Sequence, residues 1–211
     1  MKIFGSRVTW GLLLIAGGVL LLLQNLKLLP ESSLLWLAAF GLAGLYFMGV
    51  FFSGADHWWA AFPAFALLGI AAIIALTEFT GVPDEWAGAV FLGSLGVGFL
   101  VIYLRSRAHW WPIIPGGALL TMAGLVLITS RVEEPTATQL GAALFGGLAL
   151  TFLLVYAAPS NSGRARWAIW PAAGLVIPAL FTGAAAFRML SGMWPAALIA
   201  TGIFVLLRGR R

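Results

Sequence analysis

Long apolar stretches alternate with short polar segments along the whole chain. The stretches cover residues 8–26, 34–52, 58–76, 86–104, 110–129, 140–157, 167–186 and 193–207. Each is long enough to cross a bilayer as a modestly tilted helix, which needs about 20 residues. A span must pair its backbone groups internally, and the chain lacks the apolar–polar alternation that marks a membrane β-barrel. The pattern therefore predicts an all-α polytopic membrane protein with eight transmembrane helices.

The apolar stretches also resemble one another. Segment 109–120 repeats segment 57–68 at an offset of 52 residues, with His, two Trp, Pro, Ala and two Leu in the same places. Trp167 precedes Pro171 by four residues, as Trp111 precedes Pro115, and segment 141–148 matches segment 88–95. These matches predict a two-helix hairpin used four times within a single integral membrane domain that covers residues 1–211. The expected repeats are approximately 8–56, 57–108, 109–164 and 165–211.

Composition supports the membrane interpretation. Hydrophobic residues make up 62% of the 211 residues, charged residues make up only 9%, and the mean hydropathy is +1.01. Typical soluble domains carry about 25% charged residues, so this chain lacks the polar surface that water requires. It also contains no Cys, which excludes disulfides and Cys-ligated metal sites.

Basic residues gather in alternate connections. One side of the membrane is expected to hold the N-terminus, the connections after the second, fourth and sixth helices, and the C-terminus. That side carries nine of the 12 basic residues, namely Lys2, Arg7, Arg105, Arg107, Arg164, Arg166, Arg208, Arg210 and Arg211. The other side carries Lys27, Arg131 and Arg188. By the positive-inside rule both termini are expected in the cytoplasm. This asymmetry accounts for the net charge of +5 without a nucleic-acid partner.

Tryptophan and histidine residues stand near the beginnings of the predicted helices, where the membrane–water interface favours amphipathic rings. The expected interfacial anchors are His57, Trp58, Trp59, His109, Trp110, Trp111, Trp167 and Trp170. The two His occupy equivalent places in two repeats. A joint metal or haem site is the alternative, but it would lack help from carboxylate or thiolate ligands. We therefore expect these residues to anchor helix ends.

Small residues four positions apart mark one face of several predicted helices. The expected packing pairs are Ala89 with Gly93 and Ala142 with Gly146, and the pairs Ser94/Gly98 and Ala143/Gly147 show the same spacing. Such faces let helix backbones approach closely where lipid offers no hydrophobic driving force. We expect them to pack helices of one chain together, and a homodimer surface is the alternative.

The predicted spans contain no Asp, Glu, Lys, Arg or His. We therefore expect no catalytic, cofactor or metal site and no enzymatic activity, because such chemistry needs ionisable groups at a shared depth. Hydroxyls such as those of Thr121 and Thr151 leave a polar solute path open as an alternative, although helical Ser and Thr usually bond to backbone. The basic side chains expected to contact anionic lipid are Arg105, Arg107, Arg208, Arg210 and Arg211.

The first apolar stretch carries a further pattern. It begins with Trp10 and Gly11, continues through Gly17 and a run of Leu, and ends with Asn25 and Leu26. This pattern resembles the transmembrane region of LiaI/LiaF-like bacterial envelope-stress membrane proteins, over about 25 residues. The resemblance implies a non-catalytic protein of the bacterial plasma (inner) membrane that meets other membrane proteins.

Charge-free spans, close-packing residues and short connections together favour a non-enzymatic scaffold, accessory subunit or regulator. Its expected partners are membrane lipids and other membrane proteins or further copies of itself. The alternative is a small transporter or channel for a neutral or apolar solute or lipid, built around the axis that would relate the four hairpins.

Overall fold

The computed structural model describes residues 33–107, 109–132, 135–158 and 165–183, together with residues 11, 15, 17–19, 21–23, 25, 26 and 199. All regular structure in this part of the chain is helical. The α-helices are α2 (Ser33–Ser53), α3 (Ala61–Thr80), α4 (Ala87–Arg105), α5 (Ile113–Arg131), α6 (Ala137–Ala157) and α7 (Ile169–Gly183). Short 3-10 helices, Ala55–Ala60, Asp84–Trp86 and Arg166–Ala168, lead into α3, α4 and α7.

Five of these helical segments are long and apolar enough to cross a membrane. They are Ser33–Ser53, Ala55–Thr80, Asp84–Arg105, Ile113–Arg131 and Ala137–Ala157. The all-helical prediction is therefore confirmed for the described residues. Of the first predicted span, residues 11, 15, 17–19, 21–23 and 25 are described and helical, and of the eighth only residue 199 is described.

Local sequence explains where the helices begin and end. Thr136 and Gln139 form a capping box at the start of α6, with the Gln139 N–H donating to Thr136 Oγ1 (3.2 Å) and the Thr136 N–H donating to Gln139 Oε1 (3.0 Å). Reciprocal bonds of this kind satisfy two backbone donors that a helix start leaves free. Gly81 ends α3 with a φ of 62°, a left-handed conformation that glycine adopts without a Cβ penalty.

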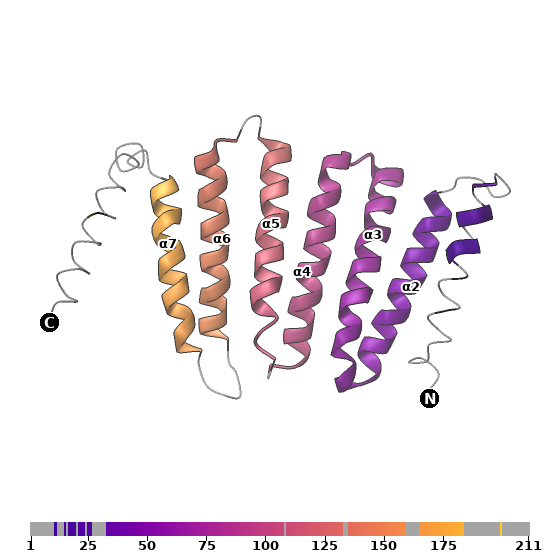
Figure 1. Cartoon of the computed structure of the whole chain (residues 1–211), viewed down its shortest axis with the longest axis horizontal. Coiled ribbons are helices and arrows are strands. Elements are labelled where there is room, and N and C mark those ends of the chain that lie inside the picture. Colours follow the sequence, from indigo (N-terminus) through magenta and orange to yellow (C-terminus); the bar gives the residue numbers. More distant parts are fainter. Residues whose placement is uncertain are drawn as a thin grey trace.

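The helices stand side by side in a single row, in the order in which they occur in the chain (Figure 1). Each packs mainly on the helices next to it in sequence, most extensively in the pairs α2–α3, α4–α5 and α6–α7. We call the edge that holds the connections α2–α3, α4–α5 and α6–α7 the aromatic edge, and the edge that holds the connections α3–α4 and α5–α6 the splayed edge. Figure 1 shows the row spreading from the aromatic edge, drawn below, toward the splayed edge.

The buried residues explain this spread, because the two buried clusters gather toward the aromatic edge. One cluster consists of Phe51, Ala60, Ala61 and Ile102. The other consists of Tyr103, Ile113, Val155, Ala158 and Ala168. Phe51 and Tyr103 lie 52 positions apart, as do Ala61 and Ile113, and Ile102 and Val155 lie 53 apart. Residues 52 or 53 positions apart thus contribute to two separate cores, and both cores tie helices together at the same edge.

Glycine permits the closest helix approaches, and these too recur. A Cβ atom on Gly44 in α2 would lie 2.7 Å from Cγ of Leu68 in α3. A Cβ atom on Gly96 in α4 would lie 2.8 Å from Cγ of Leu120 in α5. At both positions the absence of a side chain leaves room for a leucine of the neighbouring helix, and any larger residue would displace that leucine. The glycine and the leucine of the second contact each lie 52 positions after those of the first. The α2–α3 and α4–α5 pairs therefore share one packing register.

Candidate functional site

The aromatic edge carries a repeated tryptophan contact. Three tryptophans, one in each connection at this edge, meet a phenylalanine of the preceding helix edge to face. The pairs are Trp59–Phe47, Trp111–Phe99 and Trp167–Phe152, with ring centroids 6.4, 6.1 and 6.2 Å apart. Such geometry is favourable beyond the area that it buries, because the positive ring edge meets the negative face.

Further aromatic contacts join neighbouring connections. Trp58 meets Trp111 at 5.8 Å, and Trp110 meets Trp167 at 5.7 Å. These rings also remain partly open, since Trp58 and Trp111 are each 36% exposed and Trp167 is 47% exposed. The structure thus brings most of the predicted anchors into one belt that joins α2 to α7. Trp170 differs, because its side chain is 79% exposed and makes no ring contact with the described residues.

The two histidines have different surroundings despite their equivalent positions. His57 Nδ1 is hydrogen-bonded to Ser53 Oγ at 3.0 Å, and that hydroxyl also donates to the Val50 carbonyl at 2.7 Å. The His109 ring lies 6.4 Å from the Trp58 ring, and its buried Nδ1 has no hydrogen-bond partner among the described residues. Within the described part of the chain no three His, Cys, Asp or Glu residues lie together as a metal site requires.

Two of the arginines expected to contact lipid also interact with aromatic rings and hydrogen-bond acceptors of the protein itself. The Arg105 guanidinium lies 4.9 Å from the Phe51 ring and donates to the Phe52 carbonyl at 3.4 Å. Arg107 lies 5.0 Å from the Tyr103 ring and donates to its hydroxyl at 3.3 Å. Both side chains remain exposed, so each guanidinium keeps further donors for a lipid phosphate. Arg208, Arg210 and Arg211 lie outside the described residues.

The predicted packing residues behave unequally. Ala89 is buried, and a Cβ atom on Gly93 would lie 3.9 Å from Cβ of Ala123 in α5. Ala142 is half-buried, but a Cβ atom on Gly146 would meet no described atom within 4 Å. The packing role of Gly146 therefore stays a prediction, while the other predicted pair at this spacing, Ala143/Gly147, includes a glycine in close contact. The neighbouring Gly147 makes the contact, because the crossing of α5 and α6 turns that residue toward α5.

The crossing of α5 and α6 is reciprocal. Gly147 lies against Thr121, and Gly117 lies against Thr151, so that each helix offers one glycine and one threonine. Thr121 Oγ1 donates to the Gly117 carbonyl at 2.8 Å, and Thr151 Oγ1 donates to the Gly147 carbonyl at 2.9 Å. These hydroxyl protons are thus used within each helix. The two threonines fill a helix crossing.

The crossing of α3 and α4 involves positions 52 or 53 residues before those of the α5–α6 crossing. Where one crossing has a glycine, the other has a larger residue. Gly98 lies against Phe65, and Gly69 lies against Ser94. Ser94 Oγ donates across the interface to the Phe65 carbonyl at 2.6 Å. Compared with α5–α6, all four positions shift by 52 or 53, and each contact again combines one glycine with one larger residue.

Charges separate between the two edges. The described residues at the aromatic edge include Arg105, Arg107 and Arg166 with Asp56, whereas the splayed edge carries Arg131 with acidic residues. The acidic residues described there are Glu78, Asp84 and Glu85. The aromatic edge is therefore the more basic of the two.

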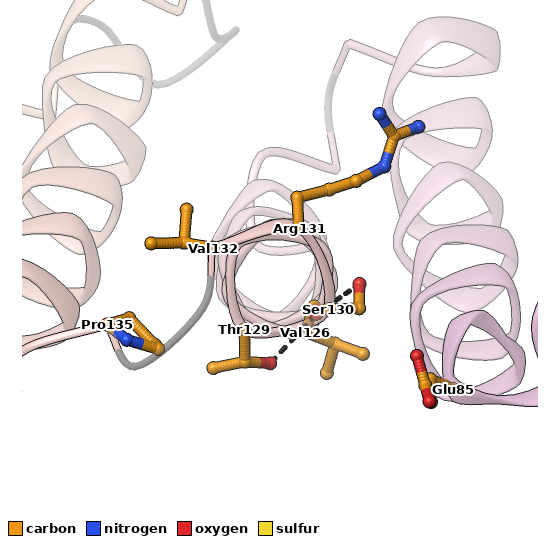
Figure 2. Close-up of a pocket in the computed structure, with 7 residues that line it drawn as sticks. All are labelled: Glu85, Val126, Thr129, Ser130, Arg131, Val132 and Pro135. Carbon is orange, nitrogen blue, oxygen red and sulfur yellow. Dashed lines mark hydrogen bonds between the residues drawn. The ribbon is translucent and has the colours of Figure 1, made fainter.

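A pocket of about 530 Å³ opens at the splayed edge, around the end of α5 and between the starts of α4 and α6 (Figure 2). Among the described residues, the charged ones that line it are Glu85 and Arg131, and Arg131 lies 4.4 Å from the Trp86 ring centroid. Figure 2 shows Ser130 and Arg131 on the side of α4, where Glu85 lies, and Val132 and Pro135 on the side of α6. From the sequence, Arg131 entered only the count of basic residues on each side of the membrane, and Glu85 carried no prediction. The available signal was a pair of opposite charges in successive connections on one side.

A scan against protein-family models finds no match, and searches of curated proteins and of solved structures also find none. The relationship to LiaI/LiaF-like proteins stays a prediction from the first apolar stretch.

Proposed function

We propose that the protein is a non-enzymatic scaffold or accessory subunit that packs with other membrane proteins. The observation that carries this proposal is the single row of helices, each held mainly by its neighbours in the chain (Figure 1). A row leaves two broad faces that the described chain does not cover. Large apolar side chains on these helices, such as Leu104 (61% exposed) and Leu150 (57% exposed), are free to contact lipid or another protein.

The arrangement favours this function over a transporter or channel. A transport path must be enclosed by protein or lined by polar groups at mid-depth. One layer of helices encloses no path by itself, and the threonines of α5 and α6 are used at a helix crossing. The pocket in the described region lies at one edge and does not lie midway along the helices.

The proposed architecture has eight spans formed by four related hairpins. Recurrence of equivalent contacts supports it. The tryptophan–phenylalanine contact occurs three times, and the buried clusters and glycine crossings each occur twice at an offset of 52 or 53 residues. Independent helices would have no reason to repeat their partners at one spacing, whereas duplicated hairpins would.

We place the protein in the bacterial plasma membrane with both termini in the cytoplasm. The more basic aromatic edge supports this orientation, since cytoplasmic connections carry an excess of Lys and Arg. The absence of native Cys allows single-cysteine labelling. With Ala55→Cys at the aromatic edge and Ala137→Cys at the splayed edge, a membrane-impermeant thiol reagent applied to intact cells should label only the second variant. The opposite result would invert the orientation.

The scaffold function is tested by cysteine crosslinking in native membranes. Leu150→Cys places a thiol on an exposed face, and Ala149→Cys is a matched control because Ala149 is only 2% exposed. We expect Leu150→Cys, with a membrane-permeant bifunctional reagent, to yield a stoichiometric adduct of one defined mass that the control does not form. A monomer in mild detergent, with no adduct from Leu104→Cys or Leu150→Cys, would contradict the proposal.

A further inference from the structure

The pocket at the splayed edge combines opposite charges with an apolar wall. Glu85 and Arg131 both line it and both are exposed, yet these two described residues form no ion pair with each other. Arg131 is held over the Trp86 ring. Its guanidinium is thereby positioned, but its N–H donors have no hydrogen-bond partner among the described residues.

The hydroxyls of the pocket are set up as acceptors. Thr129 Oγ1 donates to the Val126 carbonyl at 2.9 Å, and Ser130 Oγ donates to the same carbonyl at 3.0 Å (Figure 2). A hydroxyl has one proton and two lone pairs. Since both protons are used, what each hydroxyl offers a ligand is an acceptor. The described lining residues of the pocket therefore present one cationic donor group, one carboxylate and two neutral acceptors.

Position determines which ligand meets these groups. The pocket lies where α4 begins and α5 ends, beside Trp86, and interfacial Trp residues sit at the depth of lipid head groups. Val126 lies about one turn inside the end of α5 and begins the apolar wall. A molecule held here would keep a polar part at the edge and lay an apolar part along the helices.

We propose that this pocket binds a phospholipid whose head group carries both a phosphate and a primary ammonium, as in phosphatidylethanolamine. The Arg131 guanidinium binds the phosphate, for which its forked donors are suited. Glu85 accepts from the ammonium, with the Thr129 and Ser130 hydroxyls as additional acceptors. A choline head group has no N–H to donate, and an anionic head group leaves Glu85 opposite negative charge. The site is separate from the scaffold function, because it requires only that the splayed edge lie at head-group depth.

Native mass spectrometry of the detergent-purified full chain tests the assignment. Phosphatidylethanolamine, phosphatidylcholine and phosphatidylglycerol with the same acyl chains are added in turn. We expect the ethanolamine lipid to bind about tenfold more tightly than the choline lipid, as the loss of a hydrogen bond to a charged group implies. Glu85→Gln should reduce this preference to about twofold or less, and Arg131→Gln should weaken all three lipids.

Matched variants separate the pocket from general surface charge. Glu78→Gln removes a carboxylate at the same edge outside the pocket, and Arg166→Gln removes an exposed arginine at the aromatic edge. Both should retain the ethanolamine preference, and Trp fluorescence checks that every variant remains folded. Equal binding of the ethanolamine and choline lipids to the wild type would overturn the proposal. So would a preference that survives Glu85→Gln, or binding of soluble phosphoethanolamine as tight as that of the lipid.

Discussion

The contact of Gly117 with Thr151 permits a quantitative test of how α5 and α6 are held together. A Cβ atom on Gly117 would lie 2.8 Å from Cβ of Thr151 and 2.5 Å from its Cγ2, whereas carbon atoms attract best at about 3.5–4.0 Å. No rotamer change moves the Cβ atom of Thr151, so Gly117→Ala must push the helices apart. Such overpacking costs about 1–3 kcal/mol, and the higher helix propensity of Ala offsets about 1 kcal/mol. We expect the free energy of unfolding to fall by up to about 2 kcal/mol.

A double-mutant cycle with Thr151→Gly gives the decisive measurement. At the equivalent α3–α4 crossing the larger residue, Phe65, is on the first helix and the glycine, Gly98, is on the second. The combination of Gly117→Ala with Thr151→Gly moves the α5–α6 crossing toward that arrangement. The double variant should therefore be more stable than the sum of the single effects by about 1 kcal/mol or more. Unfolding in mixed micelles, followed by Trp fluorescence, measures all four proteins.

Gly146→Ala is the matched control. It makes the same chemical change in the same helix pair, but a Cβ atom there meets no described atom within 4 Å. It should leave the unfolding free energy unchanged or raise it slightly, because only the helix propensity changes. Equal losses for Gly117→Ala and Gly146→Ala, or an additive cycle, would refute the packing argument.

Three further substitutions, the last with Trp170→Ala as its control, probe the helix ends. Thr136→Ala removes the capping box of α6 and should cost about 1 kcal/mol in unfolding free energy, with an unchanged midpoint as the contrary result. Arg105→Gln removes the hydrogen bond to the Phe52 carbonyl and the contacts with the aromatic rings. Hydrogen exchange at the end of α2 should therefore accelerate about fivefold or more, in line with the modest net value of one hydrogen bond. Exchange equal to wild type would show that Arg105 does not stabilise the end of α2. Trp111→Ala loses two edge-to-face contacts and should cost about 1–3 kcal/mol, whereas Trp170→Ala should be close to neutral; equal costs would show that the belt does not stabilise the fold.

Helix positions were predictable because bilayer thickness and backbone pairing leave few choices. The apolar stretch 34–52 became α2 (Ser33–Ser53), and 140–157 became α6 (Ala137–Ala157). The short polar segments between the stretches, together with Gly81 and Thr136, account for the helix ends. The all-helical class followed from the same constraints. Eight spans and cytoplasmic termini stay predictions, because they depend on residues that the structure does not describe.

The arrangement of the helices was not predictable, because nearly every face of each helix is apolar. Hydrophobic periodicity identifies a buried face only when the opposite face is polar. The pairs Ala142/Gly146 and Ala143/Gly147 have identical spacing, and only the crossing of α5 and α6 decides which glycine meets a partner. The pocket could not be predicted from the sequence for a related reason. Glu85 and Arg131 are 46 positions apart, and they line the same pocket only because α4 packs against α5.

The row has a mechanical consequence. When each element is stabilised mainly by the ones beside it, total stability approaches a sum of local terms, and no single central core must fail at once. A chain drawn out of the bilayer from one terminus should therefore yield in steps, one or two helices at a time, with the remainder intact. Force spectroscopy should record a series of separate ruptures. A destabilising substitution in the helices at one end of the row should leave the helices at the other end folded.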